Sequence, residues 1–98
     1  MSEGRKFDTG KARWSLLPWR ETEEAVEVLT IGSVKYEDLN WQKVPNARDR
    51  YFSAAMRHFI AWRGGEKKDP ETGKSHLAHV ACCILFLMWF DNEDKSAK

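Results

Sequence analysis

The sequence predicts an all-α protein, a small three-helix domain with an extended N-terminal arm. Three segments repeat apolar residues at the spacing of one helix face, and glycine, proline or polar stretches separate them. The chain has 98 residues, 42% of them hydrophobic, and five tryptophans, which is typical of one folded domain. Residues 1–98 are therefore expected to form a single domain. Within it, 1–18 form an arm packed on the helices and 91–98 a flexible tail.

The first helix is predicted over residues 19–36. Pro18 stands where a helix can begin, and the glutamates that follow lie in the early turns, where the helix dipole stabilises negative charge. Helical spacing places four residues on one stripe that is expected to be buried, namely Ala25, Val28, Leu29 and Gly32.

The second helix is predicted over residues 49–63, where a Gly-Gly pair ends it. Its apolar face is marked by Phe52, Ala55, Met56, Phe59 and Trp62. A polar loop with two turn signals, Asp-Pro and Thr-Gly, follows, and the third helix is predicted over residues 75–90.

The third helix is apolar on nearly every side, as a helix at the centre of a larger protein would be. Two other helices can hardly surround it, so part of its surface is expected to meet another copy of the chain, in a dimer or larger homo-oligomer. Its apolar run of 14 residues, Leu77 to Phe90, is about 21 Å long and too short to cross a bilayer core of about 30 Å. Cys82 and Cys83 have no disulfide spacing and are interpreted as small core residues in a reducing compartment. We therefore expect a soluble, cytoplasmic protein.

The charges of the chain nearly balance, with 16 basic and 15 acidic residues, so no overall field attracts nucleic acid or an anionic membrane. Neither is expected as a partner. Residues 21–45 are acidic and lie between two basic segments, 1–20 and 46–75. This pattern can hold a metal beside a phosphate chain, but solvated helix faces that pair with one another explain it more simply.

The candidate metal ligands are two glutamates and the three histidines of the chain. Glu24 and Glu27 have the i,i+3 spacing that presents hard oxygens to Mg²⁺ or Mn²⁺, although exposed helices are commonly rich in glutamate. The histidines, His58, His76 and His79, all lie near expected helix contacts, and their nitrogens favour a transition metal over Mg²⁺. The alternative is structural, with His76 capping the third helix and His79 bonded to a backbone group or a loop carboxylate.

The candidate phosphate-binding and base-stacking residues are Lys11, Arg13, Lys35, Arg57 and Trp41. The segment DTGKAR, residues 8–13, places a glycine beside a lysine but lacks the longer Gly-rich loop of a phosphate-binding motif, so a solvated arm is the simpler interpretation. Arg57 would contact phosphate or form a surface ion pair. Tryptophans lie more often in the core than on bases, and Trp41 is the best stacking candidate because it falls in a loop.

Three segments carry a resemblance to a known family. They read FDTGKARWSLLPW, LTIGSVKYEDLNW and AAMRHFIAWRGGEKKDPETGKSHLAHVACCILFL. Across residues 6–88 the chain resembles a small, phage-encoded, MazG-like family, the N-terminal domain of dATP/dGTP diphosphohydrolases. The resemblance implies an all-α domain of phage nucleotide metabolism, in the cytoplasm of an infected bacterium.

The resemblance also implies a chemistry. MazG-like proteins hydrolyse nucleoside triphosphates to monophosphate and pyrophosphate, in dimers or tetramers, with Mg²⁺ or Mn²⁺ held by an ExxE helix and an ExxD helix. On that pattern Glu24 and Glu27 match the first pair and are the catalytic candidates. His76 and His79 stand where the second helix has its carboxylates, an exchange expected to shift the preference towards Zn²⁺, Co²⁺ or Ni²⁺.

Two functions are therefore expected as alternatives. In the first, the chain is a metal-dependent phosphohydrolase of (deoxy)nucleoside triphosphates. In the second, the same pocket binds a nucleotide or a nucleotide-derived signal without cleaving it, as a sequestering or accessory protein. A purely structural helical oligomer is a third possibility.

Overall fold

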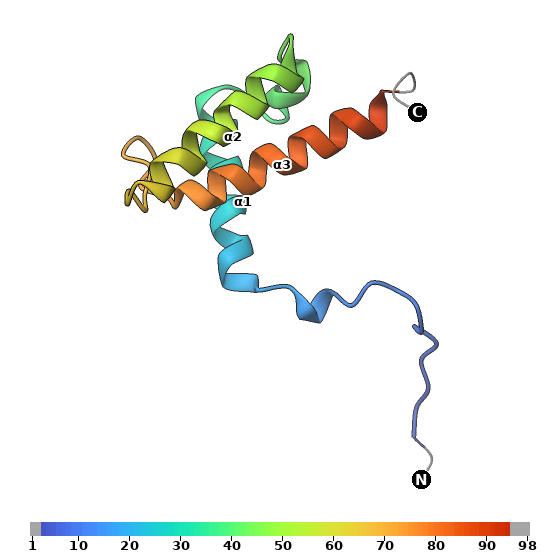
Figure 1. Cartoon of the computed structure of the whole chain (residues 1–98). Coiled ribbons are helices and arrows are strands. Elements are labelled where there is room, and N and C mark those ends of the chain that lie inside the picture. The colour runs from blue at the N-terminus through green and yellow to red at the C-terminus, as the bar shows by residue number, and fades with distance from the viewer. Residues whose placement is uncertain (1–2, 95–98) are drawn as a thin grey trace.

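A computed structural model describes residues 3–94, and within that range the chain forms three α-helices and no β-strand (Figure 1). Helix α1 spans Trp19–Lys35, α2 spans Ala47–Arg63 and α3 spans His76–Glu93. Two short 3₁₀ helices, η1 at Trp14–Leu16 and η2 at Asn40–Lys43, precede α1 and α2. The all-α fold class is confirmed.

Two helix ends differ from the sequence prediction by two or more residues. Helix α2 begins at Ala47, two residues before the predicted start. Helix α3 continues past Phe90 to Glu93, so part of the expected tail is helical. Arg48 of α2 pairs there with Asp91 at 2.6 Å, which joins the start of α2 to the end of α3. Residues 95–98 of the expected tail lie outside the described residues.

The core lies where α3 packs between the other two helices. Helices α2 and α3 run side by side and are joined by the loop of residues 64–75, while α1 crosses behind α3 (Figure 1). The buried apolar residues are nearly all small, namely Ala25, Ala47, Ala55, Ala78, Val80, Cys82 and Cys83. Small side chains at these contacts let the helix backbones approach closely. One such approach brings the thiol of Cys82 to 3.2 Å from the carbonyl oxygen of Ala25.

Both cysteines are buried and free, as predicted for core residues. Burial raises the pKa of Cys82 to about 12 and that of Cys83 to about 11, so both are neutral thiols at physiological pH. Within residues 3–94, no helix combines the length and the apolar content that crossing a membrane requires.

Much apolar surface on α2 and α3 is left uncovered. On α2, Ala55 is buried, but Phe52, Met56 and Phe59 of the predicted apolar face are exposed. On α3, four large side chains are exposed because each helix has too few neighbours to surround it, namely Leu77, Ile84, Leu85 and Met88.

The N-terminal arm does not pack on the helices as predicted. It runs away from them in an extended path (Figure 1), and Phe7 and Trp14 are 83% and 70% exposed. The described arm forms one short 3₁₀ turn, in which no residue is buried. In the described part of the arm, Phe7, Trp14 and Leu16 therefore remain exposed.

Candidate functional site

The loop of residues 64–75 shapes one end of the helix pair. Helix α2 ends where Gly65 adopts φ +107°, a conformation that glycine reaches without strain, and the N–H of Glu66 donates to the carbonyl of Ala61 at 3.0 Å. An isolated antiparallel bridge then joins Lys68 to Ser75. Ser75 caps α3, because its hydroxyl oxygen accepts the N–H of Leu77 at 3.0 Å. The loop is thus tied at both ends, and His76 does not act as the helix cap.

Asp69, within this loop, is fixed by Thr72. Its Oδ2 accepts the backbone N–H and the hydroxyl of Thr72, each at 3.1 Å. A hydroxyl has one proton and a carboxylate only accepts, so Thr72 donates to Asp69 and accepts from Nε2 of His79, 2.8 Å away. His79 therefore carries its proton on Nε2. Burial acts to raise the pKa of Asp69, but the two hydrogen bonds from Thr72 outweigh it and the pKa is lowered.

A second series of hydrogen bonds joins one residue of α2, one residue of the loop and one residue of α3. Nε2 of His76 lies 2.6 Å from Oε1 of Glu66, and its Nδ1 lies 2.8 Å from Nδ1 of His58. Because the carboxylate of Glu66 accepts, His76 holds its proton on Nε2 and offers the lone pair of Nδ1. In the neutral pair His58 is then the donor through Nδ1. His76 is only 3% exposed, so its ring is held in this orientation.

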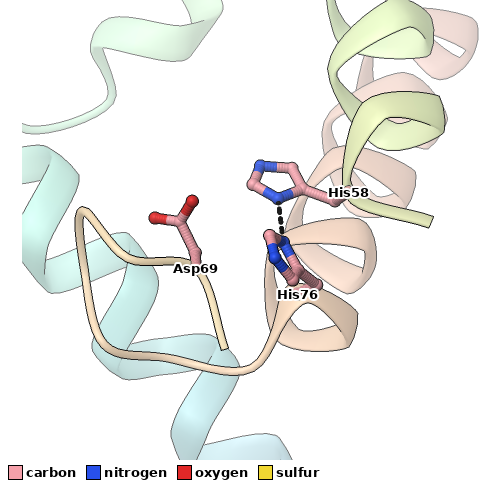
Figure 2. Close-up of side chains that lie close together, drawn as sticks. All are labelled: His58, Asp69 and His76. Carbon is pink, nitrogen blue, oxygen red and sulfur yellow. Dashed lines mark hydrogen bonds between the residues drawn. The ribbon is translucent and has the colours of Figure 1, made fainter. Parts of the chain in front are cut away.

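The two sets of hydrogen-bonded residues meet at a cluster of possible metal ligands. His58, Asp69 and His76 each bring one ligand atom, and these atoms lie within 4.8 Å of one another. Figure 2 shows the two imidazoles facing each other, with the carboxylate of Asp69 approaching from the loop on the other side. The side chains come from α2, the loop and α3, which the fold places together at one end of the helix pair.

His58 and His79 are kept neutral by their surroundings. Their rings stack with centroids 4.4 Å apart and planes 11° apart. Burial lowers the pKa of His58, and the neighbouring His79 and His76 lower it further. Burial also lowers the pKa of His79, against the opposing charge of Asp69. Neutral imidazoles retain the lone pair that a metal or a proton requires.

The cluster opens into a cavity of about 620 Å³. His58, Asp69 and His79 line it, as do Trp41 and Phe86. The indole of Trp41 stacks on Phe86 with ring centroids 4.4 Å apart. This volume is in the range of small-molecule sites, about 300–1,000 Å³. Most of the exposed lining area is apolar, but charged and polar side chains also line the cavity.

The two glutamates expected as metal ligands make other contacts. The carboxylate of Glu24 accepts the backbone N–H of Ser75, and Glu27 pairs with Lys74 at 3.2 Å. Glu24 and Glu27 thus bind the segment just before α3, and they are not members of the cluster of possible ligands found within residues 3–94. His79 also lies outside that cluster, bonded to Thr72.

Of the five expected phosphate-binding or stacking residues, Lys35 and Trp41 line the cavity. Lys35 pairs at 2.7 Å with Glu71, which also lines the cavity. Arg57 lines a separate polar hollow beside Arg50 and Lys43. The remaining two, Lys11 and Arg13, are exposed on the arm.

Comparison with known proteins identifies the family. The family described as dATP/dGTP diphosphohydrolase, N-terminal, matches residues 1–98. The chain belongs to this family. One similar protein is the dATP/dGTP diphosphohydrolase of Salmonella phage PMBT28, which is 42% identical over 89 residues, 91% of this chain. The chain spans only 30% of that relative's length. No solved structure is significantly similar.

The all-carboxylate magnesium site implied for MazG-like proteins does not fit this member of the diphosphohydrolase N-terminal family. Magnesium prefers six oxygen ligands in near-octahedral geometry. The cluster offers two imidazole nitrogens and one carboxylate, and the expected carboxylates of α1 are bonded elsewhere. We therefore derive no reaction step through Mg²⁺.

Sequence reasoning missed Asp69, Thr72 and Glu66. All three lie in the polar loop, where Asp69 and Thr72 were interpreted only as turn residues. The signal that could have found them is the Asp-x-x-Thr spacing, which forms a side-chain-to-backbone turn and leaves a carboxylate fixed in place.

Proposed function

We propose that this chain is a nucleotide-binding and metal-dependent phosphohydrolase domain, which cleaves (deoxy)nucleoside triphosphates to monophosphate and pyrophosphate in the cytoplasm of a phage-infected bacterium. The observation that carries the proposal is one cavity that joins a histidine–aspartate cluster to an aromatic wall. The family and the name of its phage relative support the substrate class.

Different residues of the cavity would contact different parts of the nucleotide. Aromatic surface at Trp41 offers a face for the base. Lys35, which lines the cavity, would exchange its partner Glu71 for a phosphate and so supply a positive charge there. His79 holds its proton on Nε2 and keeps Nδ1 free of it, so it is the candidate base that takes a proton from the attacking water.

A turnover assay tests the proposal. The purified chain is incubated with dNTPs, NTPs and cyclic nucleotides and with Mg²⁺, Mn²⁺, Co²⁺ or Zn²⁺ in turn, and products are followed by chromatography and mass spectrometry. We expect catalytic release of a monophosphate and pyrophosphate. The protein is then heat-denatured. An intact nucleotide released only at that step would show that the chain is a sequestering or accessory protein and not a hydrolase.

Glu24 and Glu27 remain the catalytic candidates that the resemblance implies. Substitution to glutamine, one at a time, decides their role. If they hold the catalytic metal, both variants lose turnover and metal together. If they only attach α1 to the start of α3, both variants bind metal as the unchanged chain does.

The uncovered apolar faces support a homo-oligomer, a dimer or larger. The chain exposes 8262 Å², whereas a compact monomer of its mass is expected to expose about 5,800 Å². The excess is larger than the roughly 800 Å² that each partner buries in an interface of standard size. The projecting arm contributes part of this excess, and the exposed side chains of α2 and α3 contribute another part.

A further inference from the structure

We propose that His58, Asp69 and His76 together bind one first-row transition-metal ion, such as Zn²⁺, Co²⁺ or Fe²⁺, in preference to Mg²⁺. The carboxylate ligand comes from the loop between α2 and α3 and not from α1. The inference rests on the proposed function for what the ion does to a nucleotide. Binding of the ion itself is measured without any nucleotide.

The spacing of the two imidazoles is that of adjacent ligands. Nδ1 of His58 and Nδ1 of His76 lie 2.8 Å apart. Imidazole nitrogens bind such ions at about 2.1 Å, so neighbouring ligand atoms around an octahedral ion lie about 3.0 Å apart. An ion bound by both nitrogens would lie beside the line that joins them, about 1.6 Å from its midpoint, so both rings would turn slightly from their present hydrogen bond. Asp69 completes the set after a shift of about 1–2 Å, since its ligand atom lies within 4.8 Å of the others.

The tautomer of His76 is already the one that a metal requires. Glu66 accepts the proton of Nε2 at 2.6 Å, which leaves the lone pair of Nδ1 directed at His58. A carboxylate on the far nitrogen of a metal-binding histidine is a common supporting contact, and it makes the ring a stronger donor. Besides the shift of Asp69, binding needs the proton on Nδ1 of His58 to leave, by exchange to Nε2 through solvent.

The donor set explains the preference among metals. Two neutral nitrogens and one carboxylate suit imidazole-binding ions, whereas Mg²⁺ favours oxygen and gives up its water reluctantly. One carboxylate against a divalent ion leaves a net positive charge. Three protein ligands also leave coordination positions for water or phosphate, and His58 and Asp69 line the cavity in which a nucleotide would lie.

Cobalt titration of the full chain tests the proposal. The protein is treated with EDTA and dialysed, and Co²⁺ is then added while the visible absorption of the ion is followed, with Mg²⁺ and Zn²⁺ as competitors. We expect one Co²⁺ per chain, displaced by an equivalent of Zn²⁺ but not by a hundredfold excess of Mg²⁺. Asp69→Asn and His58→Asn should each abolish the cobalt spectrum, and circular dichroism checks that each variant is folded.

Substitutions of two exposed glutamates in the same loop supply a test variant and its matched control. Glu66→Gln should weaken cobalt binding about 10- to 100-fold, since it removes the supporting carboxylate of His76. Glu71→Gln, which breaks only the pair with Lys35, should leave cobalt affinity unchanged. Equal effects of the two substitutions, or an unchanged cobalt spectrum in Asp69→Asn and His58→Asn, would overturn the site.

The site and the proposed function fail in different ways. If the chain binds cobalt but turns over no nucleotide, the metal site is supported and the hydrolase is refuted. If the Asp69→Asn variant still turns over nucleotide with Mg²⁺, the hydrolase is supported and the metal site is refuted.

Discussion

The carboxylate of Glu24 accepts the backbone N–H of Ser75, and this bond ties the middle of α1 to the start of α3 across 51 positions of sequence. Ser75 is also the cap of α3, so one short segment is held from both sides. A carboxylate at the N-terminus of a helix is further stabilised by the helix dipole.

This contact predicts a stability role for Glu24. Glu24→Ala should lower the free energy of unfolding by about 1–3 kcal/mol, because it leaves the N–H of Ser75 without its charged acceptor. Thermal or urea denaturation measures the effect. Glu23→Ala, an exposed neighbour on the same helix, is the control and should change stability little. Equal losses for the two variants would contradict the assignment.

Thr72 is predicted to position Asp69 and His79. Thr72→Val keeps the shape of the side chain but removes the hydroxyl that joins them, so nucleotide turnover should fall about tenfold or more. Thr72→Ser retains the hydroxyl and should restore most of the activity. Steady-state kinetics on both variants measures this, and a serine variant as impaired as the valine variant would argue against the hydrogen-bond role.

The metal-free protein is predicted to lose stability in mild acid. The pKa values of His58 and His79 are lowered by burial from 6.5, so the unfolded chain takes up protons before the folded one does. Their contribution is fully present above about pH 6.5 and is lost as the pH falls through the lower folded values. Melting curves in EDTA from pH 8 to pH 4.5 should show this decline. His58→Asn should reduce the slope, and an unchanged slope would place the proton uptake elsewhere.

The cysteines are predicted to be inert in the folded chain. Their pKa values are raised by burial to about 12 and about 11, and the reactive form of a thiol is the thiolate. Alkylation by iodoacetamide at pH 8 should therefore be slow in the native protein and fast in urea. Mass spectrometry of the labelled protein counts the modified thiols, and rapid native labelling would show that the α1–α3 contact opens readily.

The exposed face of α3 is predicted to lie in a subunit interface. Ile84→Asp or Met88→Asp should convert an oligomer to monomer, because a charge would be buried between copies. Val34→Asp, at a more exposed apolar position on α1, is the control and should keep the oligomer. Light scattering after size exclusion measures the mass. A monomeric unchanged chain would refute the oligomer itself.

The helices of this protein could be predicted because each has a local cause. Pro18 precedes α1, the glycines after Arg63 end α2, and the polar loop precedes α3. The arm illustrates the opposite case. Its apolar residues indicated packing on the domain, but a short segment with few such residues does not by itself specify which surface it meets. In this structure Phe7, Trp14 and Leu16 of the described arm remain exposed.

The candidate site was likewise predictable in part from the sequence and in part only from the tertiary structure. The sequence by itself predicted that three histidines lie near helix contacts, and it named His58 and His76 among the candidate ligands. Only the tertiary structure decided which carboxylate joins them. Helical spacing fixes neighbours within α1 and so made Glu24 and Glu27 conspicuous. Asp69 reaches the two imidazoles through a loop whose path depends on hydrogen bonds between residues distant in sequence.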